Sequence, residues 1–400
     1  MSFNVIQASK NIARKYQRYL QTVFDISDPE YKALFKQQLN QSEPFAKGPY
    51  LDVVDSFKKG HTVKELVANG TLNKGFEKIG DIYEKTLYIH QEMALKRAME
   101  GHSLVVSTGT GSGKTESFLL PILNSLMQEK DANGGKLTPG VRALIIYPMN
   151  ALANDQIDRL RISLKDYPDI TFGAYTGQTE YKEDKAILQY KKLNGEDKTP
   201  LKNELLSRER MKKTPPHILI TNYAMLEYLM LRPEDNVFFN GEYAKNWKYI
   251  VLDEAHTYTG STGIEVSLLL RRVMASIDAS HIQYILTSAT LGDENTNNEV
   301  VEFAHNLCNA HFGIEDVIRA TRIDLSQENK SIDLGIDFYS FVAEQISLGY
   351  DDAIILQKIK DYFGYSSNKT DLGEFLFGLL LKDETYWKIK NYLCVPRSVK

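Results

Sequence analysis

The chain has 400 residues, which gives room for two or three domains. Its net charge of −4 gives no global attraction to nucleic acid, so any basic binding track would have to be local. It shows no apolar run near the roughly 20 residues of a membrane span and no signal-peptide core, and its two cysteines, Cys308 and Cys394, are too few for a disulfide framework or a zinc site. We therefore expect a cytoplasmic protein without a membrane segment.

Residues 1–85 are predicted to form a mostly helical accessory region. Apolar and aromatic residues recur at helical spacing between Ile12 and Val23, and Asp28-Pro29 can open a second helix. A helix through Met93 to Met99 follows and should end at Gly101, where a helix-terminating glycine belongs.

The stretch LVVSTGTGSGKTE, residues 104–116, has the strand, glycine-rich turn and helix of a phosphate-binding loop. Its glycines allow backbone N–H groups to approach phosphate oxygens, the helix N-terminus adds partial positive charge, and Lys114 adds a full charge. Thr115 is left to place its hydroxyl on Mg²⁺. The predicted nucleotide-binding loop is Thr108, Gly109, Thr110, Gly111, Ser112, Gly113, Lys114 and Thr115.

Short apolar strands alternate with helices after this loop. Such alternation predicts an α/β fold whose parallel sheet is covered by helices on both faces, with ligands bound at the carboxyl ends of the strands. The predicted strands span residues 104–107, 142–147, 171–175, 217–220, 249–252 and 283–286.

An acidic pair, Asp253 and Glu254, ends one of these strands. Such a pair alone would usually be an acidic cluster at a helix N-terminus. Together with a Lys-Thr phosphate loop it can divide the work of hydrolysis, because Asp253 could hold Mg²⁺ while Glu254 orients and deprotonates the attacking water.

Seven motifs occur in one order along the chain. They are Gln91, TGTGSGKT (108–115), YPMNALANDQ (147–156), TG (176–177), TNYAML (221–226), DEAH (253–256) and SAT (288–290). This set resembles the first, RecA-like motor domain of superfamily 2 DEAD/DEAH-box helicases.

The resemblance implies a role for each motif. Gln91 would read adenine, whose edge suits the donor and acceptor of an amide. Lys114 and Thr115 would bind phosphate and Mg²⁺, and the acidic pair would serve hydrolysis of ATP. Coupling of hydrolysis to movement would fall to His256, Ser288 and Thr290. Contacts with the nucleic-acid backbone would come from Pro148, Asn150, Thr176, Gly177, Thr221 and Asn222.

A narrower resemblance covers roughly residues 30–325. The segments KGPYLDV (47–53), TNYAMLEYLMLRPED (221–235) and DEAHTYTGSTGIEVSLLLRRV (253–273) are similar to large bacterial helicases of the YprA-like, DISARM and Druantia groups, found in DNA repair and phage defence. This likeness favours DNA over RNA as the track and implies partner proteins of a defence system.

The family pattern also requires a second motor domain with a Gln/Arg-rich motif, which we do not find after Thr290. We expect three regions: the accessory region 1–85, the RecA-like ATP-binding domain 86–325, and a helical segment 326–400 that leads to a second motor domain not present in this chain. On this view the sequence is the N-terminal piece of a longer helicase or translocase. Alone it should hydrolyse ATP poorly, because the missing arginine stabilises the transition state.

Two alternative functions stay open. The chain could be an ATP-binding scaffold without turnover, although a scaffold has no need of Glu254. It could also be a metal-dependent nuclease, since Asp169 with Glu183-x-Lys185 matches a loose nuclease pattern. The charge-dense segment 180–213 could be an insertion along the nucleic-acid track, but its composition favours a mobile, solvated hairpin or loop.

Overall fold

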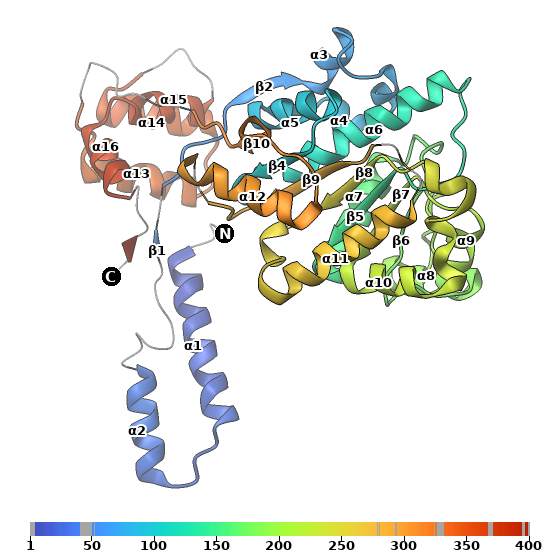
Figure 1. The fold of residues 1–400 in the computed structure, drawn as a ribbon. Helices are drawn as coiled ribbons and strands as arrows, with labels where there is room; N and C mark the ends of the chain where they lie inside the picture. Colours follow the sequence, from blue (N-terminus) through green and yellow to red (C-terminus); the bar gives the residue numbers. More distant parts are fainter. Residues whose placement is uncertain are drawn as a thin grey trace. The chain divides into compact units, whose positions relative to one another are not determined.

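The structure is a computed structural model that describes residues 5–40, 50–51, 53–277, 279, 281–292, 294–323, 325, 332–366, 371–393 and 397–398. It divides into two compact units, Phe57–Arg322 and the combination of Met1–Ser56 with Ile323–Lys400 (Figure 1). The predicted domain limits stay a prediction, and the larger unit begins 29 residues earlier than the expected limit at residue 86.

A seven-stranded sheet forms the centre of the larger unit, in the order β10-β4-β9-β8-β5-β7-β6. Its strands are β4 (Leu104–Ser107), β5 (Ala143–Tyr147), β6 (Phe172–Ala174), β7 (Ile218–Asn222), β8 (Tyr249–Leu252), β9 (Gln283–Ser288) and β10 (Val317–Arg319). Every neighbouring pair is parallel. The predicted α/β fold with a parallel sheet is therefore confirmed, and β10 is a strand that the sequence did not predict.

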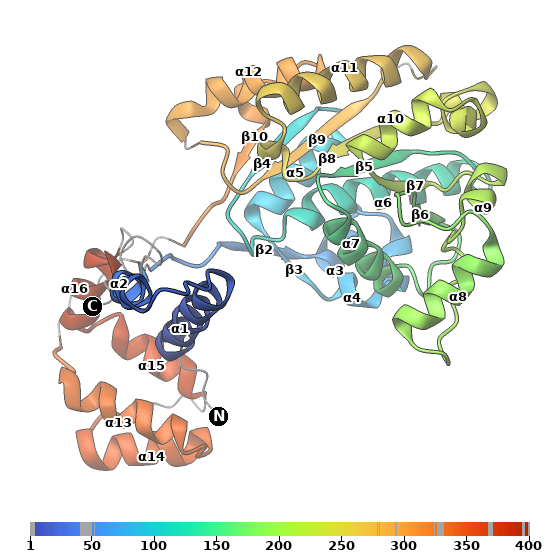
Figure 2. The same cartoon turned by 90° about the horizontal axis from the view of Figure 1, so that it is seen from below.

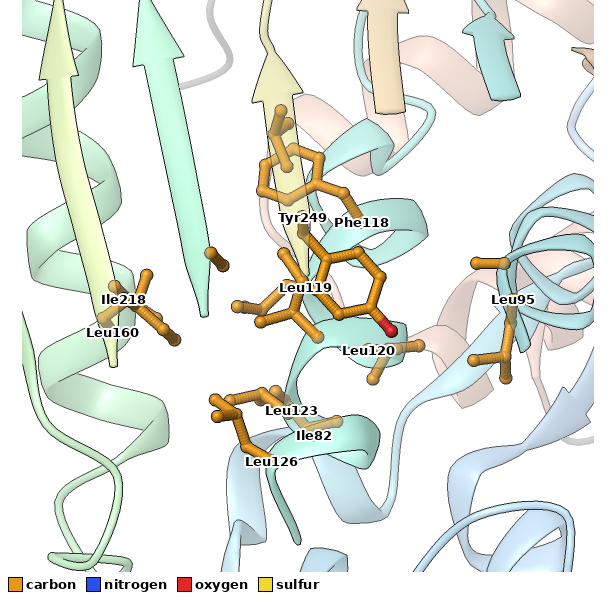
Figure 3. Close-up of a cluster of buried hydrophobic side chains, with 14 of the residues drawn as sticks. Ile82, Leu95, Phe118, Leu119, Leu120, Leu123, Leu126, Leu160, Ile218 and Tyr249 are labelled. Atoms are coloured by element: carbon orange, nitrogen blue, oxygen red, sulfur yellow. The ribbon is translucent and has the colours of Figure 1, made fainter. Parts of the chain in front are cut away.

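Helices cover both faces of this sheet (Figure 2). One face carries α5 (Ile89–Met99), α6 (Lys114–Ala132) and α7 (Asn150–Ser163), and the other carries α10 (Tyr223–Leu231), α11 (Gly260–Ser276) and α12 (Asn297–Cys308). Successive strand residues point to opposite faces, so Leu104 and Val106 join one apolar cluster and Val105 joins the other. Figure 3 shows part of the first cluster, in which leucines of α6 pack against Tyr249 of β8.

Residues 57–85 belong to the larger unit because they share its core. Strands β2 (Lys59–Thr62) and β3 (Thr86–Tyr88) pair antiparallel, and α3 (Val63–Ala68), η1 (Lys74–Lys78) and α4 (Gly80–Tyr83) lie between them in the chain. Thr62 and Glu65 form a capping box that begins α3. Phe76 and Ile82 are buried in the same apolar cluster as α6, which places this segment with the sheet rather than with the N-terminal helices.

The segment 180–213 is more ordered than the solvated loop that its composition favoured. It forms α8 (Glu183–Asn194) and α9 (Arg208–Lys213). Glu204 is buried and forms an ion pair with Arg161 of α7 at 2.7 Å, and Met211 is buried in an apolar cluster. The loop prediction is therefore wrong, because few residues of this segment are apolar but those few reach the core.

The second unit is helical, as expected for its two sequence regions. It contains α1 (Val5–Val23), α2 (Pro29–Asn40), α13 (Gly335–Ser347), α14 (Asp352–Phe363), α15 (Leu372–Leu380) and α16 (Glu384–Tyr392), with the short strands β1 (Tyr50–Leu51) and β11 (Arg397–Ser398). Phe338, Ile359 and Phe375 form the middle of a core of its own. Cys394 and most of the segment 47–53 lie outside the described residues.

Five further 3-10 helices connect elements of the larger unit: η2 (Pro233–Phe238), η3 (Gly241–Lys245), η4 (Ala255–Thr257), η5 (Glu294–Thr296) and η6 (Ile314–Asp316). Across the described part of the chain, we find no helix with both the length and the apolar character needed to cross a membrane.

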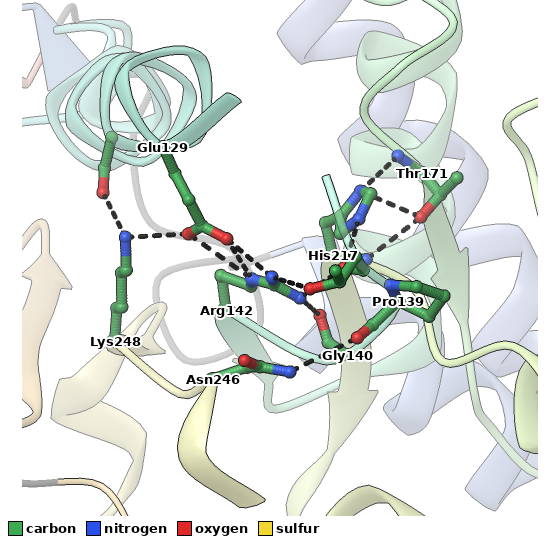
Figure 4. A network of polar contacts seen from close by, with 10 residues as sticks. Glu129, Pro139, Gly140, Arg142, Thr171, His217, Asn246 and Lys248 are labelled. Carbon is green, nitrogen blue, oxygen red and sulfur yellow. Dashed lines mark hydrogen bonds and ion pairs between the residues drawn. The ribbon is translucent and has the colours of Figure 1, made fainter. Parts of the chain in front are cut away.

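A buried polar network ties the amino-terminal ends of the central strands to α6 (Figure 4). Arg142, which is 2% exposed, donates to Glu129 at 2.6 Å and to the carbonyl of Thr138 at 2.7 Å. His217 accepts the backbone N–H of Thr171 on Nδ1 at 2.9 Å, and its Nε2 lies 3.1 Å from the same Thr138 carbonyl. This geometry fits a neutral imidazole with its proton on Nε2.

We expect protonation of His217 to destabilise the fold. Burial lowers the pKa of His217 to about 4, and the Arg142 charge adds to this shift. The folded pKa lies below the ordinary value of 6.5, so its contribution to stability is complete above that value and is lost as the pH falls toward 4. The expected loss of unfolding free energy between about pH 7.5 and about pH 5 is roughly 2 kcal/mol.

Denaturant unfolding at these two pH values measures this effect. The His217→Gln variant should lack the loss of unfolding free energy that wild type shows between these two pH values. Glutamine can make the same two hydrogen bonds without titrating. His281→Gln, at an exposed histidine, is the matched control and should unfold like wild type. Equal pH dependence in wild type and His217→Gln would contradict the assignment.

Candidate active site

The glycine-rich loop connects β4 to α6 and has a backbone that few side chains could adopt. Gly111 and Gly113 have φ of 76° and 72°, in the left-handed region that favours glycine. A Cβ atom added to Gly113 would lie 2.3 Å from Nε2 of Gln91. The hydroxyls of Thr108 and Ser112 lie 2.6 Å apart across the loop. Sequence position and conformation together therefore favour a preformed phosphate cradle.

Gln91 supports this loop from α5. The side chain is 1% exposed, its Oε1 accepts the backbone N–H of Tyr88 at 2.8 Å, and its Nε2 donates to the carbonyl of Gly113 at 2.8 Å. The amide thus connects the start of α5 with the start of α6. The predicted contact with adenine stays a prediction, because both ends of the amide already contact the backbone here.

Lys114 and Glu254 face each other although they are 140 positions apart in sequence. Nζ of Lys114 lies 3.3 Å from Oε1 of Glu254, and the two side chains are 12% and 25% exposed. Within the described residues, Nζ of Lys114 and Oε2 of Glu254 are both buried without a hydrogen-bond partner. Buried polar atoms are normally hydrogen-bonded. A bound ligand and a water molecule would supply the hydrogen-bond partners that these two atoms lack.

Asp253 and Glu254 follow β8 in a strained turn. Glu254 has φ 49° and ψ 48°, a conformation that costs about 1–3 kcal/mol in a residue other than glycine and often marks a functional site. Asp253 accepts a hydrogen bond from the hydroxyl of Thr287 on β9. Burial raises the pKa of Asp253, and this hydrogen bond opposes the shift. The acidic pair is thus fixed at the carboxyl edge of the sheet beside Lys114.

Thr115 makes its contacts on the α7 side of the loop. Its Oγ1 accepts from Nη1 of Arg159 at 3.0 Å and from Nε2 of Gln156 at 3.4 Å. The structure does not bring this hydroxyl into a hydrogen bond with Asp253 among the described residues. The predicted role of Thr115 as a Mg²⁺ ligand stays a prediction.

The three residues expected to couple hydrolysis to movement, His256, Ser288 and Thr290, lie next to one another beside Glu254. Nδ1 of His256 is 3.1 Å from Oγ of Ser288 and 3.3 Å from Oε2 of Glu254. Ser288 Oγ also accepts the backbone N–H of Thr290 at 3.1 Å, and the Ser288 carbonyl accepts the N–H of Thr108 at 3.1 Å. These contacts join the phosphate loop, the acidic turn and the end of β9, while the coupling role itself is untested.

Arg319 is a further residue of this site that sequence reasoning missed. Its Nη1 donates to Ser107 Oγ at 2.7 Å and to the carbonyls of Leu291 and Gly292 at 2.7 and 2.8 Å. It therefore connects the strand before the phosphate loop with the segment after Thr290. Its Nε and Nη2 also donate to Oδ1 of Asn297 at 3.1 and 2.9 Å. No sequence motif marks Arg319, because these partners come from separate segments that only the fold brings together.

The predicted nucleic-acid contacts gather at the carboxyl ends of three neighbouring strands. They follow or end β5, β6 and β7: Pro148, Asn150, Thr176, Gly177, Thr221 and Asn222. Asn222 Nδ2 donates to Oδ1 of Asn150 at 2.7 Å, and Gly177 is exposed. Thr221 is fully buried and donates to the carbonyl of Tyr175 at 2.7 Å. The six residues thus share one edge of the sheet, and their contacts with nucleic acid stay a prediction.

The nuclease alternative finds no support in the geometry. Asp169 pairs with Lys130 at 2.6 Å, whereas Glu183 pairs with Arg210 at 3.1 Å. Among the residues that the structure describes, no group of three or more His, Cys, Asp or Glu side chains could hold a metal ion.

A glycine-rich loop between a strand and a helix, with its lysine facing a glutamate at the end of a nearby parallel strand, is the arrangement typical of P-loop nucleotide-binding domains. Residues 88–298 match the family model described as DEAD/DEAH box helicase. The matched range is more than half of the 400 residues, so the chain belongs to the DEAD/DEAH box helicase family. The family resemblance expected from the seven motifs is confirmed.

Individual relatives narrow this placement. The chain is 32% identical to Druantia protein DruE of Escherichia coli (strain UMEA 4076-1) over 375 residues, 71% of this chain and 20% of that protein. It is 32% identical to the uncharacterized ATP-dependent helicase YprA of Bacillus subtilis (strain 168) over 216 residues, 52% of this chain and 23% of that protein. The chain thus spans about a fifth of the length of these two curated relatives.

Among solved structures, the DUF1998 helicase MrfA bound to DNA aligns with a TM-score of 0.48 and 23% identity, over 71% of this chain and 34% of that one. The predicted likeness to the Druantia and YprA groups is borne out by the two curated relatives.

Proposed function

We propose that this chain is the ATP-hydrolysing part of a motor that moves on nucleic acid. The observation that carries the proposal is the half-buried pair of Lys114 and Glu254, 3.3 Å apart. Each has a buried polar atom that lacks a hydrogen bond among the described residues, although His256 lies 3.3 Å from that of Glu254. A phosphate oxygen would satisfy the ammonium group, and a water molecule would satisfy the carboxylate. An ATP-binding scaffold without turnover would need the first group but not the second.

Each side chain has a distinct part in this chemistry. Lys114 and the N–H groups of the loop bind the phosphates and hold the γ-phosphate in place. Glu254 orients the attacking water and takes its proton. Its strained backbone keeps the carboxylate beside Lys114 rather than in solvent.

A magnesium ion fits the donor set of this site. Asp253 presents a buried carboxylate whose pKa is raised by burial, and a cation would offset the cost of burying its charge. Asp253 would hold the ion, with Thr115 after its hydroxyl leaves Arg159. The ion would neutralise charge that develops on the phosphate oxygens during transfer.

We propose DNA as the track, lying along the ends of β5, β6 and β7. The fully buried Thr221 would act by holding the Tyr175 carbonyl rather than by touching the strand. The resemblance to bacterial repair and phage-defence helicases supports DNA. The similarity to Druantia protein DruE extends the proposal to partner proteins of such a defence system. The expected cytoplasmic location is part of the same proposal.

Displacement of streptavidin from biotinylated oligonucleotides tests this function. The complete protein should release streptavidin from single-stranded DNA with ATP and not with ADP, and should release it more slowly from RNA of the same sequence. Release that ignores ATP would contradict motor activity. ATP-driven release from RNA alone would overturn the assignment of DNA.

A further inference from the structure

Arg208 lies directly beside the Thr176-Gly177 turn, although it is more than 30 positions away in the sequence. It begins α9, which lies near β6 (Figure 2). Its guanidinium group lies over the ring of Tyr175, with 5.2 Å from Cζ to the ring centroid. Nη2 donates to the carbonyl of Thr176 at 2.9 Å and approaches that of Gly177 at 3.4 Å.

The ring beneath Arg208 is itself fixed from several sides. Tyr175 is fully buried, its hydroxyl donates to Asp235 at 2.8 Å, and its carbonyl accepts from Thr221 at 2.7 Å. The backbone N–H of Arg208 donates to the carbonyl of Glu180 at 3.0 Å. A guanidinium stacked on a fixed ring loses little further freedom when it binds an anion, so this arginine is preorganised.

Among the described residues, no acidic side chain balances the charge of Arg208. Within the part of the chain that the structure describes, it makes no ion pair, and its Nε is buried without a hydrogen-bond partner. Its neighbours differ, because Arg210 pairs with Glu183 at 3.1 Å and Lys212 pairs with Asp235. A half-buried arginine with an unused donor and no counter-charge has the chemistry of an anion-binding residue.

We propose that Arg208 binds a backbone phosphate of the nucleic-acid strand next to the Thr176-Gly177 turn. This inference rests on the proposed motor function, because it assigns a residue to the same track. The segment 180–213 then contributes Arg208 to the track, whereas Arg210 and Lys212 of the same helix are held in ion pairs. The contact is to phosphate and carries no base specificity.

Binding of fluorescent single-stranded DNA at several salt concentrations tests the proposal. A plot of log affinity against log salt concentration has a negative slope. Loss of one phosphate contact on a single strand makes this slope shallower by about 0.7. Arg208→Gln and Arg208→Met should each show this loss of slope and bind about tenfold more weakly at low salt. Arg208→Lys keeps the charge and should retain the slope. Arg210→Gln, two residues away on α9, is the matched control and should keep the wild-type slope.

The outcomes separate this inference from the function on which it rests. Weaker binding by Arg208→Gln with an unchanged slope would mean that Arg208 only shapes the turn, and this would overturn the proposal. Unchanged affinity and slope would overturn it as well. Failure of the wild-type protein to bind DNA or RNA would instead overturn the proposed function. Thermal melts show whether each variant is folded. The glutamine and methionine variants test the loss of the phosphate contact independently of each other.

Discussion

Replacing Lys114 with alanine is expected to lower the rate of ATP hydrolysis by a factor of about 10²–10³, the size usually seen when one preorganised donor to a transition state is removed. Lys114 has the only full positive charge within the loop sequence 108–115, and its ammonium group lies 3.3 Å from the predicted base. The variant should also bind ATP more weakly, because the charge acts on the bound phosphates as well as on the transition state.

Phosphate release at saturating ATP, together with titration of a fluorescent ATP analogue, measures both effects. Lys136→Ala is the matched control, since Lys136 is an exposed lysine between α6 and β5. A Lys114→Ala protein with the turnover of wild type would show that the loop does not hold the reacting nucleotide.

Replacing Glu254 with glutamine should separate binding from hydrolysis. Removal of a general base lowers a rate by about 10²–10⁴, so turnover should fall steeply. ATP affinity should stay the same or increase, because the substitution removes a negative charge beside the phosphate site and frees Lys114 from its partner. Glutamine has nearly the same shape, so the strained turn at residue 254 should persist.

Single-turnover hydrolysis and equilibrium ATP binding measure these two effects. Glu265→Gln, at an exposed position on α11, is the control for a lost carboxylate elsewhere. If Glu254→Gln lost ATP binding but hydrolysed whatever bound at the wild-type rate, then Glu254 would serve only to support the loop.

The sheet could be predicted because each of its central strands is buried on both faces. A parallel strand covered by helices is a short, continuous apolar run, and ALIIY at 143–147 and YIVL at 249–252 show this pattern clearly. The motifs then follow from topology, since the carboxyl ends of parallel strands meet at one edge. For this reason Lys114, Glu254 and Ser288 could be grouped without a structure.

The missed strands are those that depend on pairing with a distant part of the chain. β10 has three residues, and it becomes a strand because Val317 and Ile318 pair with β4, more than 200 positions earlier. β2 reads KGHT and has no apolar alternation, so only its pairing with β3 defines it. Short strands of this kind give no periodic signal.

Side-chain contacts with backbone carbonyls also could not be predicted from the sequence. Arg208 and Arg319 contact carbonyl groups of loops, and any arginine carries the same donors. The amide of Gln91, whose contact with adenine stays a prediction, also contacts Gly113 and Tyr88, because the fold brings the start of α5 against the loop. Motif order identifies such residues, and only the structure identifies their partners.

The most direct test of the proposed motor is the rate of phosphate release by the complete protein with and without single-stranded DNA, compared between wild type and Lys114→Ala. We expect DNA to increase the rate in wild type, and we expect the variant to stay near background under both conditions. A wild-type protein that releases no phosphate with either DNA or RNA, or a Lys114→Ala variant that responds to DNA as wild type does, would contradict it.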